Sequence, residues 1–452
     1  MKFTKTLIAA SLAVLSTDSF AAAFQLAEHS ASGLGRAYAG EAAVADDASV
    51  VARNPALMTL FKDKQISVAG IAVIPDVSLK GESTAYGSDS STLDDDSIAP
   101  SAFVPAGYFT MPVHERVSIG FGAFSNFGLA TEFDQAYEAG SVAGETEIVT
   151  VNMNASVAYK ISEQVSLGFG LNYIYADAKV IRNAGENPYG LPAQTQTAHL
   201  EGDDYAFGWN VGAMYQLDEN SRFGFNYRSE STVDFSGEYS NQVPTQAGGF
   251  NGEIAPGQLE LTLPAIAEFS GSHQLDEKTG LHYSVLWTGW NSFEKLEAYT
   301  PSQESPVFSK KENFSNSMRY SIGGDYQYTD ALLLRAGLAY DESPADKNHM
   351  SISIPDTDRF WLSFGANYAF SKNSNIDLGA SILRGKTQNF TEKDSLAEAV
   401  PTSDASASDM GIFDAPASDA GSPDKAIERG GPKGLEPTRF GDWENNGRCT
   451  DF

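Results

Sequence analysis

The amino-acid sequence predicts an all-β fold, a transmembrane antiparallel β-barrel with a small N-terminal helical hatch in its lumen. Three observations lead to this prediction. Apolar and polar residues alternate over most of the chain, short turns alternate with long polar connections, and an export signal is followed by no apolar segment long enough for a membrane helix. Because lipid offers backbone groups no hydrogen bonds, an exported protein without such helices can cross a membrane only as a closed sheet.

The composition of the 452 residues argues against several classes of function. The formal net charge is −29, whereas nucleic-acid binding needs concentrated lysine and arginine. The single cysteine, Cys449, allows neither a disulfide within the chain nor a cysteine metal site. The acidic run Asp94-Asp95-Asp96 has the composition of solvated loop charge. The histidines lack the spacing of metal ligands, so we expect no metal and no cofactor: His29, His114, His199, His273, His282 and His349.

Residues 1–21 have the features of a secretory signal peptide. Lys2 and Lys5 precede an apolar stretch, and Ser19-Phe20-Ala21 forms a small–x–small cleavage site, so we expect cleavage after Ala21. An uncleaved anchor helix is the alternative, but the apolar stretch is shorter than the roughly 20 residues that a bilayer requires. The chain is therefore expected to leave the cytoplasm.

Residues 22–64 do not alternate and are expected to form a hatch, or plug. Asp46 or Asp47 can cap a short helix that ends at Asn54-Pro55, and Asn54 can cap a second one with Pro55 at its first position. The glycine-rich stretch 32–38 is a poor helix former. A unit of about 40 residues can hardly bury a core alone, so we expect the barrel lumen to contain it.

From residue 65 to about 390 the chain has the period of two that is typical of strands. In 149–160, 165–175 and 205–217 one face is apolar and the other is rich in serine, asparagine and glycine. These runs match or exceed the roughly 9–11 residues of a tilted membrane strand. Long connections are expected near 82–99, 129–147, 183–203, 238–257, 298–316 and 342–353, with short turns between them. That asymmetry is typical of outer-membrane barrels and not of a soluble β-sandwich.

The C-terminal segment does not fit the barrel pattern. Thirteen strands can be counted, the last near 375–390, whereas a closed bacterial barrel is expected to have an even number. Residues 391–452 are acidic, rich in Ser, Asp, Ala, Pro and Gly, and do not alternate. We therefore interpret 391–452 as an aberrant tail without the expected last strand. A frameshift after about Glu398 is one hypothesis, and a genuine acidic tail is the other.

Several motifs resemble the FadL-type outer-membrane long-chain fatty-acid transporters, and the likeness extends over about 22–390. They stand in the order of that family and are long enough to be specific. The motifs are Ala22-Ala23-Phe24-Gln25-Leu26, Ser32-Gly33-Leu34-Gly35-Arg36-Ala37-Tyr38, Asn54-Pro55-Ala56-Leu57, Ser125-Asn126-Phe127-Gly128-Leu129-Ala130-Thr131-Glu132-Phe133, Phe207-Gly208-Trp209-Asn210, Ser351-Ile352-Ser353-Ile354-Pro355-Asp356 and Asp358-Arg359-Phe360-Trp361-Leu362-Ser363.

The resemblance implies fourteen strands around an N-terminal hatch, and it implies roles for nine residues. By residue chemistry alone, Gly128 is equally an end-of-strand glycine, and Arg182 and Lys310 are equally rim cations. The implied roles are ligand binding for Phe24, Arg182 and Lys310, a lateral-gate kink at Asn126, Phe127 and Gly128, and the hatch motif at Asn54, Pro55 and Ala56.

The function that the resemblance implies is passive uptake of long-chain fatty acids across the Gram-negative outer membrane. Extracellular loops would capture the ligand, a lumenal pocket would bind it, and the bilayer would receive it sideways. Alternatives are a channel for aromatic or other hydrocarbons and a general porin. No Ser–His pair or carboxylate dyad indicates an enzyme. Expected partners are hydrophobic small molecules, outer-membrane lipid and lipopolysaccharide, with no nucleic acid, and the protein is expected to be a monomer.

Overall fold

The computed structural model describes residues 23–83, 91–346, 348–393, 412–414, 443–445 and 448–450. The chain divides into two units, Met1–Pro416 and Ala417–Phe452. The expected signal peptide and the proposed frameshift position lie outside the described residues. Within the described ranges, no helix has both the length and the apolar character needed to span a bilayer.

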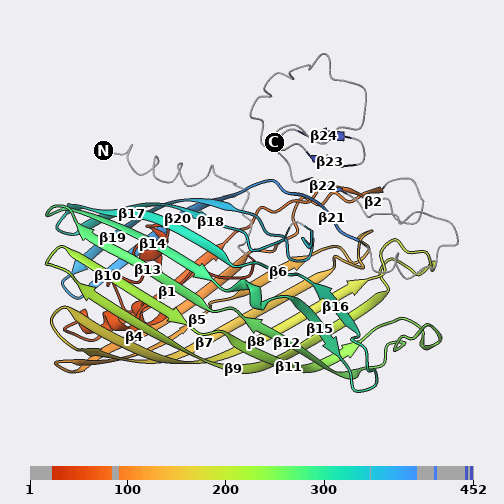
Figure 1. Ribbon diagram of the computed structural model, residues 1–452, viewed down its shortest axis with the longest axis horizontal. Helices are drawn as coiled ribbons and strands as arrows, with labels where there is room; N and C mark the ends of the chain where they lie inside the picture. The colour runs from red at the N-terminus through yellow and green to blue at the C-terminus, as the bar shows by residue number, and fades with distance from the viewer. Residues whose placement is uncertain are drawn as a thin grey trace, which may run out of the picture. The chain divides into compact units, whose positions relative to one another are not determined.

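The first unit is almost entirely antiparallel β-structure (Figure 1). Its helices are short: α2 (Ala31–Leu34), α3 (Val50–Arg53), and the 3-10 turns η1 (Pro55–Leu60), η3 (Thr245–Ala247) and η4 (Trp290–Ser292). Its strands are β1 (Gln65–Val73), β2 (Glu82–Ser83), β3 (Ser91–Thr92), β4 (Ala102–His114), β5 (Val117–Phe124), β6 (Gly128–Glu132), β7 (Glu145–Lys160), β8 (Val165–Asn183), β9 (Gln196–Gln216), β10 (Ser221–Arg228), β11 (Ser231–Ser240), β12 (Ala255–Leu263), β13 (Ile266–Gln274), β14 (Thr279–Thr288), β15 (Lys295–Tyr299), β16 (Phe308–Lys311), β17 (Ser317–Thr329), β18 (Leu332–Asp341), β19 (Arg359–Ser371), β20 (Ser374–Gly385), β21 (Asn389–Thr391) and β22 (Ile412–Asp414). In the second unit, β23 (Trp443–Asn445) pairs with β24 (Arg448–Thr450).

One sheet of 18 strands forms the wall. In five places, two consecutive strands are successive parts of the same wall strand. These pairs are β5 with β6, β10 with β11, β12 with β13, β14 with β15 and β16 with β17. The described residues therefore contain thirteen wall strands. That number agrees with the count from the sequence, and the all-β prediction is confirmed.

The two faces of the wall differ as the alternation predicts. On β7, Val149, Val151 and Met153 are exposed on the outside, whereas Asn152 and Asn154, which alternate with them, are buried. The inward asparagines hydrogen-bond across neighbouring strands: Asn152 and Asn154 both donate to Asn172, at 3.0 and 2.9 Å. An apolar outer row and a satisfied polar inner row suit a strand that has lipid on one side only.

The strands are longer than the alternation indicates. β8 continues to Asn183 and β9 begins at Gln196, inside the segment expected to be a loop. The outward residues there are charged, as at Asp177 and Lys179 on β8. A strand that rises above the lipid loses its apolar face but keeps its ladder, so hydrophobic alternation marks the membrane belt and not the strand ends.

Both ends of the sheet have one unpaired edge. Among the described strands, β1 forms a ladder only with β4, and β20 forms a ladder only with β19. Short β21 pairs with β22 instead of extending the wall. An unpaired edge in lipid is costly, so this seam is where a further strand would complete the barrel.

The N-terminal segment from Ala23 to Phe61 lies against the inner faces of the strands, where small residues allow close approach (red in Figure 1). A Cβ atom at Gly212 would lie 1.9 Å from Asn54 Oδ1, and one at Gly168 would lie 2.4 Å from the Ala56 nitrogen. Bulkier wall residues at these two positions would therefore exclude the segment from the lumen.

Candidate functional site

Phe24 lies at the centre of a buried aromatic cluster. Its ring centroid is 4.6 Å from that of Trp290, 5.2 Å from Phe293 and 5.9 Å from Phe127, all in edge-to-face geometry. Phe314 extends the cluster, 5.1 Å from Phe293. Trp290 and Phe293 come from the interruption between β14 and β15, which turns aromatic side chains inward. The result is an apolar region within the sheet.

Arg182, near the end of β8, is a buried cation at the edge of this region. Only 5% of it is exposed. It donates to the carbonyl oxygens of Glu145 and Ile181, at 3.0 and 2.8 Å, and to the Thr146 hydroxyl at 3.0 Å. Its guanidinium lies 5.7 Å from the Phe308 ring centroid, and Phe308 packs against the aromatic cluster. Among the described residues no carboxylate forms an ion pair with Arg182, although Glu392 and Glu312 act on it at longer range.

Lys310, on β16, lies in the same electrostatic cluster, together with two carboxyl groups that the sequence did not indicate. Its ammonium forms an ion pair with Glu392. Glu312 is fully buried, and neither carboxyl oxygen has a hydrogen-bond partner in the described structure. Burial raises the pKa of Glu312 to about 8, against the opposing charge of Lys310. Below that pH Glu312 is neutral and does not repel a carboxylate.

The third wall strand is interrupted at residues 125–127. Phe124 pairs with Asn152 and Gly128 with Val149, so three residues on this strand stand opposite two on β7. One extra residue is the definition of a β-bulge. The bulge bonds with the N-terminal segment as well as with β7. The Leu26 amide donates to Asn126 O at 2.7 Å, and the Gly128 amide donates to Phe24 O at 2.8 Å. On the wall side, the Thr150 hydroxyl donates to Phe127 O at 2.6 Å.

The bulge leaves a gap in the wall. The ladder between β4 and β5 ends at Gly107 and Ala123, and β6 forms no ladder with the remaining part of β4 in the described structure. A cavity of about 560 Å³ opens there. Its lining combines wall residues beside the gap with residues of β17 and β19, among them Val104, Phe127, Gly128, Leu129, Arg319 and Trp361.

His29 joins the N-terminal segment to the bulge. Its Nδ1 bonds Ala27 O at 2.8 Å, and its Nε2 accepts from Asn126 Nδ2 at 3.1 Å. Burial, with a contribution from Arg53, lowers the pKa of His29, which favours the neutral ring that this pair of bonds requires. The bulge and the segment inside the barrel are therefore coupled.

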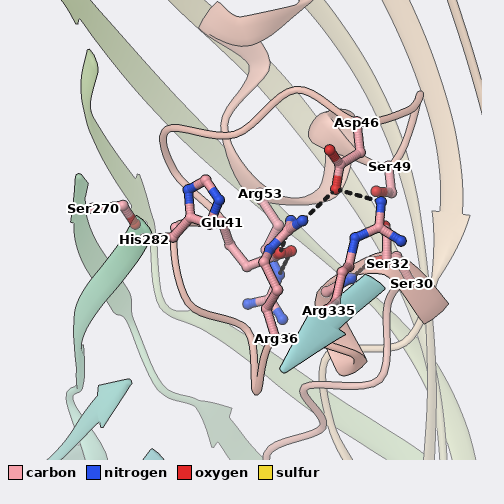
Figure 2. Close-up of polar contacts among 12 residues, drawn as sticks. Ser30, Ser32, Arg36, Glu41, Asp46, Ser49, Arg53, Ser270, His282 and Arg335 are labelled. Carbon is pink, nitrogen blue, oxygen red and sulfur yellow. Dashed lines mark hydrogen bonds and ion pairs between the residues drawn. The ribbon is translucent and has the colours of Figure 1, made fainter. Parts of the chain in front are cut away.

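A buried charge network holds the N-terminal segment to the wall (Figure 2). Asp46 lies between two guanidinium groups, 2.7 Å from Arg36 Nη1 and 3.4 Å from Arg335 Nη2. Burial opposes ionisation, but the two arginines outweigh it and lower the pKa of Asp46. Arg36 also pairs with Asp325 of β17 at 3.3 Å. Arg36 and Asp46 belong to the N-terminal segment, whereas Asp325 and Arg335 belong to the wall. The network therefore anchors the segment to the wall.

The predicted motif Asn54-Pro55-Ala56 forms a second anchor. Asn54 Oδ1 accepts from the Ala56 amide at 3.0 Å, which caps η1 as the sequence indicates. Its Nδ2 donates to Ala42 O at 2.6 Å and to Ala213 O of β9 at 2.9 Å. The preceding helix differs from expectation: α3 has Ser49 at its N-cap, and Asp47 instead accepts from the Ser49 amide at 2.8 Å.

The structure thus brings two groups of predicted residues into one region, the ligand-binding residues and the gate, whereas Ala56 of the hatch motif belongs to a separate cluster. Phe127 of the bulge touches Phe24, Phe24 touches Phe293, and the cluster continues through Phe308 to Arg182. The hydrophobic cluster around Phe24 therefore extends from the gap in the wall to Phe308, which lies beside the buried cation Arg182.

Comparison with known proteins agrees with this architecture. Residues 12–413 match the family model described as outer membrane protein transport protein (OMPP1/FadL/TodX). The chain belongs to this family. It is accordingly an outer-membrane β-barrel protein, and the resemblance inferred from the motifs is confirmed.

Relatives in the OMPP1/FadL/TodX family share about two fifths of the sequence. The chain is 41% identical over 412 residues to the long-chain fatty acid transport protein of Salmonella typhi, which covers 86% of this chain and 94% of that protein. It is 44% identical over 431 residues to a 47 kDa outer membrane protein of Pasteurella multocida, covering 91% and 97%.

Solved structures share the fold. A FadL homologue of Pseudomonas aeruginosa superposes with a TM-score of 0.74 at 23% identity, covering 87% of this chain and 96% of that one. The Pseudomonas putida toluene transporter TodX gives 0.58 at 15% identity, covering 87% and 96%.

The C-terminal segment matches a different family model. Residues 406–452 match one described as protein of unknown function (DUF1674). A frameshift after about Glu398 and a genuine acidic tail both stay hypotheses.

Proposed function

We propose that this protein takes up long-chain fatty acids passively across the outer membrane. The ligand is captured on the side of the long loops, held in the lumen by the Phe24 cluster, and released sideways through the gap at Asn126, Phe127 and Gly128. The supporting observation is the hydrophobic cluster that extends from Phe308, beside Arg182, through Phe24 to Phe127 at that gap.

The energetics favour such a route over an aqueous pore. A sixteen-carbon acyl chain gains on the order of 12 kcal/mol on leaving water, at ~0.8 kcal/mol per methylene. Passage through water would forfeit that gain, whereas an apolar cluster that opens towards lipid preserves it. Only the carboxylate needs a polar partner, and Arg182 and Lys310 are the cations at the edge of the cluster.

An uncharged hydrocarbon is the second candidate ligand. The TodX-like fold and the aromatic character of the cluster favour it. The burial of Arg182 without a carboxylate partner in the described structure favours an anion, and the fatty-acid transport names of several relatives agree with that choice. Competition between oleate and toluene for binding separates the two.

We propose the following organisation of the chain. A signal peptide, 1–21, is removed; residues 22–64 form the hatch; 65–390 form the barrel; and 391–452 are a tail without the last strand. The protein acts as a monomeric transporter and not as an enzyme, with lipid and lipopolysaccharide around its wall.

Growth on oleate tests the proposal. The full chain is expressed in a strain without its own long-chain fatty-acid transporter, and outer-membrane insertion is verified by heat-modifiable migration. Growth on oleate supports the proposal. Inserted protein that neither binds oleate nor restores growth would refute it.

A further inference from the structure

Lys310, one of the two cations that we assign to the ligand headgroup, already forms an ion pair with a carboxylate of the same chain. Glu392 follows β21, beyond the last wall strand, and is 5% exposed. One of its oxygens pairs with Lys310 Nζ, and the other accepts from the Ile352 amide at 2.9 Å. Ile352 is fully buried in the connection between β18 and β19. One carboxylate thus joins three segments on the side of the long loops.

The chemistry of this contact is that of the expected ligand. A fatty acid and a glutamate present the same carboxylate, and a lysine ammonium binds either as a point charge. The charge of Glu392 also acts on Arg182, although no hydrogen bond joins them in the described structure. Lys310 and Arg182 are therefore already under the influence of one negative charge, that of Glu392.

We infer that Glu392 is a displaceable occupant of the fatty-acid headgroup site, an internal competitor that the ligand carboxylate replaces at Lys310. This inference rests on the proposed function. When the ligand binds, Glu392 leaves Lys310 and the Ile352 amide, so the segment that follows β20 loses both contacts.

The exchange has a physical advantage for transport. Lys310 is half-buried, so leaving its ammonium without a partner has a cost, and Glu392 removes that cost while the site has no ligand. One carboxylate leaves as another enters, so the net charge near Lys310 stays constant. Ligand affinity is then set by a difference between two similar contacts, which permits release as well as capture.

Substitution by glutamine tests the inference, because Glu392→Gln removes the charge and keeps the size. Binding of oleate and of oleyl alcohol is measured on the full chain in nonionic detergent. Oleate affinity should rise about tenfold, the change expected for one lost charge-assisted contact, while the affinity for oleyl alcohol stays within about twofold. Glu253→Gln, at an exposed position between β11 and β12, is the matched control and should change neither.

A double-mutant cycle guards against indirect effects. In a Lys310→Met background the ammonium for which the two carboxylates compete is absent and only the longer-range effect of Glu392 on Arg182 is left, so most of the gain in oleate affinity from Glu392→Gln should disappear. Unchanged or weaker oleate binding by Glu392→Gln in the wild-type background would overturn the inference, as would an equal effect on both ligands. Wild-type protein that binds neither ligand would refute the proposed function itself. Wild-type protein that binds oleate, with no gain from Glu392→Gln, would refute only the exchange.

Discussion

Replacing Arg182 by methionine tests the headgroup site most simply. The guanidinium has five donor hydrogens, and three hydrogen bonds to β7 and β8 are present. Two donors thus remain for a ligand. Methionine keeps an apolar stem against Phe308 but removes the charge.

The expected loss concerns charged ligands only. A hydrogen bond to a charged group contributes about 1.5–3 kcal/mol, and each 1.4 kcal/mol is tenfold in affinity. Arg182→Met should therefore weaken oleate binding by roughly 10- to 150-fold. Oleyl alcohol, which has the same chain without the charge, should bind nearly as before.

The assay is isothermal titration in nonionic detergent, with the melting temperature measured on the same samples. The melting temperature matters because the variant leaves three polar groups on β7 and β8 without their donor. Arg384→Met, the same change at an exposed position on β20, is the matched control. Equal losses for oleate and oleyl alcohol would show that Arg182 maintains the pocket and does not bind the headgroup.

Three further predictions concern the gap, the anchor and pH. Gly128→Val should reduce oleate transfer severalfold but leave oleate binding unchanged. A Cβ at this position would lie 3.1 Å from Leu26 Cδ1, and the methyl groups of the valine would fill the gap. Undiminished transfer would argue against this exit. Arg36→Met breaks a buried ion-pair network, a change that costs about 3–5 kcal/mol, so the hatch should loosen and an aqueous conductance should appear in planar bilayers, whereas Arg384→Met should stay closed. Oleate affinity should fall as pH rises through about 8, because Glu312 then ionises beside the ligand; Glu312→Gln should flatten that dependence, and an unaltered pH profile would exclude Glu312 as its source.

The sequence predicts the wall well because alternation is a local property. Val149, Val151 and Met153 are exposed and Asn152 and Asn154 are buried, as the period of two requires. Where the strands rise above the lipid, both faces become polar and the signal disappears. The connection predicted at 183–203 is therefore shorter in the structure, where β9 already begins at Gln196.

The charged cluster could not be predicted in the same way. Lys310 and Glu392 are 82 positions apart, and their contact depends on how the segment after β20 folds. Nothing local indicates that Glu312 loses all its hydrogen-bond partners, or that the chain at Trp290 turns inward. In the sequence, the available signal for that inward turn is the break in the strand pattern between β14 and β15.

The central claim is that an apolar molecule passes from a plugged lumen into the bilayer through the wall. Oleate transfer and ionic conductance measured on one preparation of the full chain in lipid bilayers test it most directly. We predict transfer of oleate into the membrane with no steady aqueous conductance. An open ionic pore that leaves oleate behind would contradict the account.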